Sequence, residues 1–301
     1  MLYVPQHLPP ASPMIVVLHG ATQNARRYAA GAGWLALADR FGFAVLCPEQ
    51  DKKNNPCLAF NWFEPEDFAR EGGEAASIRQ MVETASAMHS LDHERIFITG
   101  LSAGGAMTSV MLATYPDVFR AGAIIAGLPY GVARGAFEAW SALYWGSYRT
   151  NREWGDQVRA AVSNDGQWPS IAVWHGEHDR TVRPGAGDDL VNQWLNVHGL
   201  DGSSFERRLT PQRSHHLWRS ATGEPKVELH RIAGMAHGTP LSTKGRDGCG
   251  QSGDYLLEVG ISSSREIARS WGLDATRFKG ERCRKGTARA LGRGPAQACS
   301  F

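Results

Sequence analysis

The sequence has few of the features that mark membrane proteins, disulfide scaffolds and zinc modules. No apolar run reaches the roughly 18 residues that a membrane span needs, and the longest are short pieces such as MIVVL and AGAIIAG. The five cysteines are scattered and form no C-x-x-C pair, which argues against a disulfide framework and against a cysteine zinc site. We therefore expect neither a membrane protein nor a metal module.

The chain as a whole also lacks a large excess of positive or negative charge. The net charge is +2, which is too small to create a field that would attract nucleic acid. Basic residues gather instead near the C-terminus, among Gly and Ala, so we expect one catalytic domain over residues 1–273 and a basic tail over 274–301. We expect no nucleic-acid partner and no membrane association, and the oligomeric state is open, a homodimer included.

The first residues read as an extended segment that stops at Pro5. They contain neither the charged region nor the apolar region of a signal peptide. This start favours a mature secreted or periplasmic form over a cytoplasmic one.

Short β-branched or apolar runs alternate with segments of helical periodicity, which is typical of βα units. The predicted strands cover 14–18, 43–46, 95–99, 121–126, 171–174 and 226–232. The predicted helices cover 33–41, 74–89, 105–115, 188–198 and 264–271. The chain is therefore predicted to form an α/β fold with a mostly parallel central sheet and helices on both faces.

Two segments interrupt this alternation as apparent insertions. Residues 128–169 are rich in Trp and Tyr, and residues 201–225 form a loop rich in Arg and His. Loops that bind substrate are often decorated in this way, although aromatic loops also cover cores.

The motif GLSAGG places Ser102 directly after a predicted strand and directly before a predicted helix. A strand-to-helix turn of this kind exposes a serine hydroxyl at the C-terminal edge of a sheet, and small neighbours let a substrate approach. A G-x-S-x-G match alone is weak in a chain with 34 glycines, so its context decides. We predict that Ser102 is a nucleophile.

Two downstream loops supply the acid and the base that a serine nucleophile needs. After one predicted strand comes HGEHDRTV, in which Asp179 is the predicted acid and Glu177 its rival. After a later strand comes AGMAHGTP, in which flanking glycines leave His237 free to reach Ser102. The order Ser, acid, His is that of α/β-hydrolases.

Other histidines are poorer candidates for the base. His230 lies inside a strand pattern, and His215 lies beside His216 in the basic segment. His175 and His178 are three residues apart in HGEHD, but ligands on an extended loop need not converge. We predict no metal site.

Acyl transfer also needs hydrogen-bond donors for the oxyanion. One is expected to be the backbone N–H of Ala103, directly after the nucleophile. The other is expected from the LHGATQN loop after the first long strand, where we assign the N–H of Ala21. His19 in this loop is interpreted as a structural hydrogen-bonding residue.

Together, the LHG loop, the GLSAGG turn, WHGEHDRTV and GMAHGTP resemble the α/β-hydrolase esterases of the polyhydroxybutyrate depolymerase type. Further matches are CPEQ, FNWF, NQW and GISSSREIARSWGL. The resemblance implies a serine hydrolase without metal or organic cofactor that acts on polyester, feruloyl or acetyl esters. Its catalytic triad maps onto Ser102, Asp179 and His237. The family often reads HGC where this chain has Ala21, but a backbone donor survives that change.

The substrate is open at this stage. The chain is also similar to bacterial poly(aspartic acid) hydrolases, for which basic residues beside a cleft would attract a polyanion. Aromatic residues favour an apolar polyester instead, and a non-catalytic polyanion-binding protein on a hydrolase scaffold is a third alternative. The candidate substrate-binding residues are Asn61, Trp62, Arg207, Arg208 and Arg213.

Overall fold

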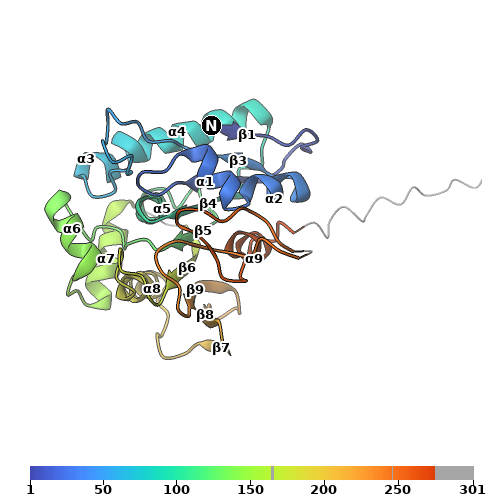
Figure 1. Ribbon diagram of the computed structural model, residues 1–301. Helices are drawn as coiled ribbons and strands as arrows, with labels where there is room; N and C mark the ends of the chain where they lie inside the picture. The colour runs from blue at the N-terminus through green and yellow to red at the C-terminus, as the bar shows by residue number, and fades with distance from the viewer. Residues whose placement is uncertain (164–165, 246, 275–301) are drawn as a thin grey trace, which may run out of the picture.

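The computed structural model describes residues 1–163, 166–245 and 247–274, and a nine-stranded sheet lies at the centre of this part of the chain (Figure 1). In sheet order the strands are β1 (Leu2–Tyr3), β3 (Ala44–Leu46), β2 (Met14–Leu18), β4 (Ile96–Leu101), β5 (Ala121–Ile125), β6 (Ser170–Gly176), β9 (Pro225–Ile232), β8 (Arg213–Arg219) and β7 (Glu206–Thr210). The strands from β3 to β9 in this order are parallel, and β1, β8 and β7 pair antiparallel at the two edges. β10 (Thr239–Leu241) and β11 (Leu256–Glu258) form a separate parallel pair.

Helices cover both faces because each buried strand carries apolar side chains on both sides. In β2, Met14, Val16 and Leu18 face one core, whereas Ile15 and Val17 face the other. The first core is covered by α3 (Pro65–Phe68), α4 (Gly73–His89), α5 (Ala103–Thr114), α6 (Ala136–Tyr144), α7 (Asn151–Ala161) and α8 (Gly185–His198). The second is covered by α1 (Ala25–Gly31), α2 (Trp34–Phe41) and α9 (Ser263–Ser270).

The predicted fold class is confirmed, and all six predicted strands are present within a few residues. The prediction that residues 201–225 form a loop is wrong, because most of them form the hairpin of β7 and β8 that extends the sheet. The aromatic segment 128–169 contains α6 and α7. The predicted tail lies, from residue 275 onward, outside the described residues. None of the helices described is long and apolar enough to cross a membrane.

The parallel strands end at one edge of the sheet, and the loops that follow them meet there. Ser102 follows β4, the HGEHD loop follows β6, and the loop containing His237 follows β9. The loop containing Ala21 follows β2, which is the neighbour of β4. Ligand sites of α/β sheets lie at this carboxyl edge.

Candidate active site

Ser102 lies in a strained turn between β4 and α5. Its backbone has φ 56° and ψ −117°, a conformation that is costly for a residue with a side chain. The Ser102 N–H donates to the Ile125 carbonyl (2.9 Å), and a Cβ at Gly104 would collide with the carbonyls of Leu18 and His19. Glycine at position 104 thus lets the start of α5 pack against the end of β2, which places the Ser102 turn beside the loop of Ala21.

Asp179 and His237 are hydrogen-bonded to each other. His237 Nδ1 donates to Asp179 Oδ2 at 2.7 Å, and both side chains are buried. The two loops are tied together, because the His178 N–H donates to the Met235 carbonyl (2.9 Å) and a Cβ at Gly176 would collide with it. The structure therefore brings together the predicted acid and the predicted base across 58 residues of sequence.

The surroundings of Asp179 keep its carboxylate ionised. Burial alone would raise its pKa, but hydrogen bonds from His175 and His237 hold the pKa of Asp179 well below its usual range. The N–H of Val182 donates to Asp179 Oδ1 (2.9 Å), so both carboxylate oxygens accept hydrogen bonds. Glu177, the rival acid, is exposed. Asp179 can therefore hold His237 in one tautomer and stabilise its charge when it is protonated.

In the loop after β2, the run from Gly20 to Gln23 leaves one backbone N–H without a partner among the residues that the structure describes. The N–H of Gly20 donates to Gln23 Oε1 (2.9 Å), that of Thr22 to the Cys57 carbonyl (2.7 Å) and that of Gln23 to the Gly20 carbonyl (3.3 Å). Within the described residues, neither the N–H of Ala21 nor that of Ala103 donates to another group. These are the two donors that the sequence predicts for the oxyanion.

His19 is buried in this loop and accepts and donates backbone hydrogen bonds. Its Nδ1 lies 2.8 Å from the Gly20 carbonyl, and the Gln50 N–H donates to its Nε2 (3.2 Å). Burial lowers the pKa of His19, which favours the neutral ring with a proton on Nδ1. The ring therefore supports the loop.

The Ser102 hydroxyl makes no side-chain hydrogen bond to any residue that the structure describes. Ser102 is half-buried, and the Cβ that an alanine at position 20 would carry lies 3.6 Å from Ser102 Cβ. The hydroxyl can therefore rotate towards a base or a substrate, and catalytic hydrogen bonds often form fully only when substrate is bound.

Asn61 and Trp62, predicted to contact substrate, lie in the interior. Asn61 accepts a hydrogen bond from Asn55 Nδ2 (2.7 Å) and donates to Asp67 Oδ2 (3.1 Å). Trp62 packs edge-on against Phe63 in the core on the α5 side of the sheet. Each of these two residues is only 7% exposed, so little of either side chain is available to a polymer.

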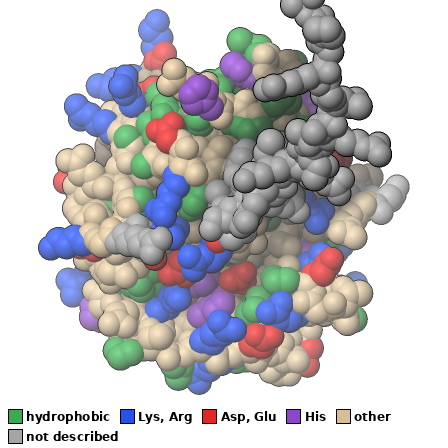
Figure 2. All heavy atoms as spheres, turned by 90° about the vertical axis from the view of Figure 1, so that its right-hand side faces the viewer, with side chains coloured by type: hydrophobic (Ala, Val, Ile, Leu, Met, Phe, Trp, Pro, Cys, Tyr) green, Lys and Arg blue, Asp and Glu red, His purple; other side chains and the backbone are tan. Residues whose placement is uncertain are grey.

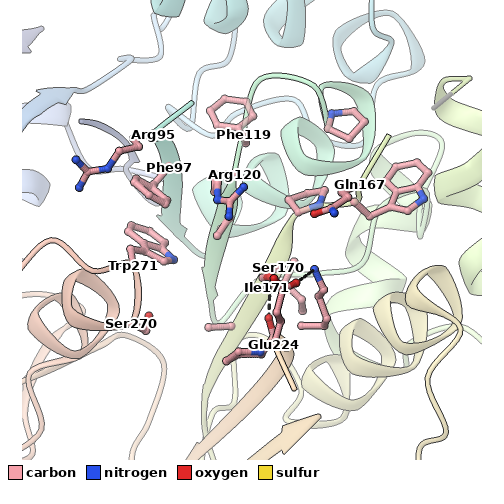
Figure 3. Close-up of a pocket in the computed structure, with 18 of the residues that line it drawn as sticks. Arg95, Phe97, Phe119, Arg120, Gln167, Ser170, Ile171, Glu224, Ser270 and Trp271 are labelled. Carbon is pink, nitrogen blue, oxygen red and sulfur yellow. Dashed lines mark hydrogen bonds and ion pairs between the residues drawn. The ribbon is translucent and has the colours of Figure 1, made fainter. Parts of the chain in front are cut away.

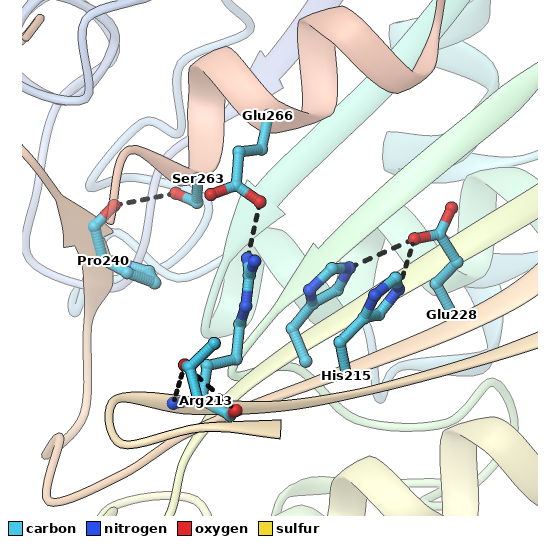
Figure 4. Close-up of polar contacts among 8 residues, drawn as sticks. Arg213, His215, Glu228, Pro240, Ser263 and Glu266 are labelled. Carbon is cyan, nitrogen blue, oxygen red and sulfur yellow. Dashed lines mark hydrogen bonds and ion pairs between the residues drawn. The ribbon is translucent and has the colours of Figure 1, made fainter. Parts of the chain in front are cut away.

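The three predicted arginines lie on the β7–β8 hairpin. Arg207 and Arg208 are exposed and lie within β7, in register with His216 and His215 of β8. β7 is two strands beyond β9, about 10 Å at ordinary strand spacing. Arg213 pairs with Glu266 at 2.5 Å (Figure 4). The structure thus does not gather these arginines beside Ser102.

One further group of side chains has the composition of a metal site. Within the described part of the chain, His215, Glu228 and His230 are the three ligating residues that come together, and Figure 4 shows His215 aimed at Glu228. The two imidazoles are stacked, however, with centroids 4.1 Å apart and planes 10° apart. The Nε2 atoms of both rings are hydrogen-bonded to Glu228 Oε2, at 2.9 and 3.2 Å, so in this structure the three side chains form a hydrogen-bonded cluster.

Cavities occur on both sides of the molecule. One of about 1050 Å³ is lined by residues at the starts of parallel strands, such as Arg95 before β4, Arg120 before β5 and Ser170 at the start of β6 (Figure 3). It therefore lies at the edge of the sheet opposite Ser102. Another, of about 630 Å³, is lined by Gln23 of the β2 loop and by Tyr255, whose ring lies edge-on to His237. Of these two cavities, the second lies nearer to the candidate site.

Exposed aromatic side chains gather on α6 and the residues that follow it. We call this group the aromatic platform: Phe137, Trp140, Tyr144, Trp145 and Tyr148. Trp145 and Tyr148 are 63% and 105% exposed, and the Trp140 and Trp145 rings are 4.8 Å apart. The Arg183 N–H donates to the Leu143 carbonyl (2.8 Å), which ties α6 to the chain just after Asp179. Another face, shown in Figure 2, mixes Lys and Arg with Asp and Glu.

A family model described as Esterase PHB depolymerase matches residues 2–215. Poly(3-hydroxyalkanoate) depolymerase C of Paucimonas lemoignei is 43% identical over 273 residues, which are 90% of this chain and 66% of that protein. Feruloyl esterase B of Thermothelomyces thermophilus is 34% identical over 66% of this chain and 70% of its own length. Acetylxylan esterase of Coprinopsis cinerea is 32% identical over 80% of this chain and 65% of its own length. The chain thus spans about two thirds of the length of these relatives.

Solved structures show the same fold. An acetyl xylan esterase from Aspergillus awamori matches with a TM-score of 0.76 and 21% identity, over 90% of this chain and 93% of that one. A poly(3-hydroxybutyrate) depolymerase from Bordetella parapertussis matches with a TM-score of 0.51 and 17% identity, over 78% and 77% of the two chains. These likenesses establish the α/β-hydrolase fold.

Proposed function

The chain belongs to the Esterase PHB depolymerase family, and on that premise we propose that it is a serine esterase that cleaves the ester bonds of an apolar polyester through an acyl-enzyme. The observation that carries the proposal is the hydrogen bond from His237 to Asp179 at the carboxyl edge of the sheet, where Ser102 occupies a strained turn. The family and the fold support ester hydrolysis, and the aromatic platform supports an apolar polymer.

The proposed chemistry assigns a role to each group. Ser102 Oγ attacks the ester carbonyl carbon while His237 Nε2 accepts the hydroxyl proton, and Asp179 stabilises the resulting imidazolium. The N–H groups of Ala21 and Ala103 donate to the oxyanion, and one such donor is worth about 3–4 kcal/mol of the barrier. His237 then returns the proton to the leaving alcohol. Water repeats the sequence on the acyl-serine and releases the acid.

The aromatic platform is the proposed contact with the polymer surface. It offers large, rigid side chains that are already exposed, so stacking against a polyester costs little ordering of the protein. A solid polymer outside the cell cannot cross a cell envelope, which supports a secreted location. The exposed arginines of β7 do not favour a polyanion, because β7 lies five strands away from β4, the strand that Ser102 follows.

Initial rates on a poly(3-hydroxybutyrate) film, on poly(aspartic acid) and on p-nitrophenyl butyrate test this assignment. We expect hydrolysis of the film and of the small ester. Turnover of poly(aspartic acid) that falls as salt is added, with no release from the film, would replace the polyester by a polyanion.

A double variant, Trp145→Ser with Tyr148→Ser, separates the platform from the chemistry. We expect weaker adsorption to the film and a rate on p-nitrophenyl butyrate within about twofold of wild type, because neither ring is needed for catalysis. Met88→Ser is the control, since Met88 is an equally exposed apolar residue on α4. Film adsorption equal in both variants would remove the platform from substrate binding.

A further inference from the structure

We propose that Glu74, which is outside the triad, is a positioning residue that fixes the orientation of the Ala21 N–H through two chains of hydrogen bonds. The inference rests on the proposed function, because it concerns the oxyanion site of that same reaction. Ala21 is the one residue in the run from Gly20 to Gln23 whose N–H is free within the described structure. Its flanking peptide groups are held, and both supports lead back to Glu74.

Glu74 lies in the first turn of α4 and accepts hydrogen bonds with both carboxylate oxygens. Oε1 accepts from Gln50 Nε2 (2.5 Å) and Asn54 Nδ2 (2.7 Å), and Oε2 accepts from the Asn61 N–H (2.7 Å). All three partners are N–H donors. The ionised carboxylate therefore satisfies each of them, whereas a protonated carboxyl or an amide would turn a hydrogen towards one donor and lose that contact.

The first chain runs through Gln50 to the residue before Ala21. The side chain of Gln50 is hydrogen-bonded to Glu74, and the backbone N–H of Gln50 donates to His19 Nε2 (3.2 Å). His19 Nδ1 donates in turn to the Gly20 carbonyl (2.8 Å). The Gly20 carbonyl belongs to the peptide group that carries the Ala21 N–H, so this chain sets the plane of that donor.

The second chain runs through Asn61 to the residue after Ala21. Asn55 Nδ2 donates to Asn61 Oδ1 (2.7 Å), and Asn55 Oδ1 accepts from the Cys57 N–H (2.9 Å). The Cys57 carbonyl accepts from the Thr22 N–H (2.7 Å). Thr22 has φ 65°, a conformation that a residue with a side chain keeps only when its surroundings hold it.

Burial makes the ionised form of Glu74 unfavourable, so its hydrogen bonds to three donors are what justifies a carboxylate at this position. Burial raises the pKa of Glu74 to about 7, against the lowering effect of its hydrogen bonds. Asp67 of α3 faces Glu74 and raises the pKa further. His19 belongs to the first chain. Burial lowers the pKa of His19, although the hydrogen bond to Gly20 and the charge of Glu49 act in the opposite direction. A neutral residue would pack here without this cost but would not serve all three donors.

Glu74→Gln tests the proposal with p-nitrophenyl butyrate as the probe. Because the oxyanion forms only during the reaction, we expect kcat to fall about 10- to 100-fold while KM changes less than about threefold. Glu83→Gln on the same helix is the matched control, since Glu83 is exposed and pairs only with Arg79 in the structure described. We expect the control to match wild type.

Asn55→Ala keeps the test open if Glu74→Gln fails to fold, because it breaks the second chain and leaves Glu74 in place. We expect a smaller fall in kcat, with KM again little changed. The positioning role would be overturned if the variant that folds, Glu74→Gln or Asn55→Ala, had the same kcat as Glu83→Gln. In that case, loss of activity in Ser102→Ala would still support the esterase assignment. An inactive wild type would instead overturn the proposed function.

Discussion

Two carboxylates in this molecule each lie within 3.3 Å of two histidine nitrogens, and the two clusters differ in what surrounds them. Asp179 Oδ2 lies 2.7 Å from His237 and 3.3 Å from His175, at the ends of parallel strands. Glu228 Oε2 lies 2.9 Å from His215 and 3.2 Å from His230, along β8 and β9. Residue types and distances are therefore nearly the same in the two places.

The geometry of the rings separates the two clusters. His230 stacks on Trp174 at 3.7 Å with planes 4° apart, and His215 stacks on His230. The Nε2 atom of each ring is hydrogen-bonded to Glu228, so neither Nε2 atom is available to a serine. In His237, Nδ1 is hydrogen-bonded to Asp179, and Nε2 is therefore available to a nucleophile. A carboxylate–histidine pair can serve in catalysis when it lies at the carboxyl ends of the strands and when one ring nitrogen has no other hydrogen bond.

The largest expected difference between the two clusters is the effect on kcat of removing one imidazole ring. His237→Ala should lower kcat on p-nitrophenyl butyrate by at least about 10⁴-fold, because Ser102 loses its base. His215→Ala should leave kcat within about threefold, because that ring only supports β8. Steady-state rates of the two variants measure the contrast, and similar losses in both would mean that the clusters are not functionally distinct.

The next difference concerns the two carboxylates. Asp179→Asn should lower kcat by about 10³- to 10⁴-fold, because the amide no longer favours the tautomer of His237 with a proton on Nδ1. Glu228→Gln should retain activity but lower the free energy of unfolding by about 1–3 kcal/mol, since a buried donor loses its acceptor. Kinetics and urea unfolding of both variants check this. Full activity in Asp179→Asn would contradict the assigned role of Asp179.

The smallest difference is in how stability depends on pH. Burial would raise the pKa of Glu228, but hydrogen bonds from His215 and His230 lower it to about 2. The folded pKa is below the unfolded value of about 4.3, so this contribution is present above that value and is lost as pH falls towards 2. Burial lowers the pKa of His230 to about 4, so further stability is lost between about pH 6.5 and 4.

Glu228→Gln should therefore lose less stability than wild type between about pH 4.5 and 2, by at most about 3 kcal/mol. Comparing these two proteins cancels the opposite contribution of Glu74, whose raised pKa makes stability fall as pH rises from about 4.5 to 7. Thermal unfolding over the acid range measures the difference. Parallel pH curves for the two proteins would show that Glu228 is not held ionised by its histidines.

The sequence predicts the parallel strands and the loops at their carboxyl edge well because the signals there are local. Runs such as MIVVL form strands buried on both faces, and each predicted site loop directly follows such a run. The sequence does not predict the hairpin of β7 and β8, because ERRLT is exposed throughout and its single apolar residue, Leu209, gives no periodic signal. Edge strands of this kind depend on pairing with a neighbour, which the sequence does not display.

The supports of the site were not predictable for a related reason. Glu74 reads in sequence as an acid in the first turn of a helix, which is a common surface feature. Its partners Gln50, Asn54 and Asn61 lie in a loop without a regular pattern, and the path of that loop alone brings them to the carboxylate. Asn61 and Trp62 are predicted from the sequence to contact substrate, but the sequence does not display that both side chains are buried.

Labelling with a fluorophosphonate tests the central claim most directly, since the reagent reacts with a serine only when that serine is activated by a base and an oxyanion site. Peptide mass spectrometry should find one phosphonyl group on Ser102 of the wild-type protein, and none on Ser102→Ala, which should also have lost hydrolysis of p-nitrophenyl butyrate. An unlabelled Ser102, or Ser102→Ala that hydrolyses the ester at the wild-type rate, would contradict the account.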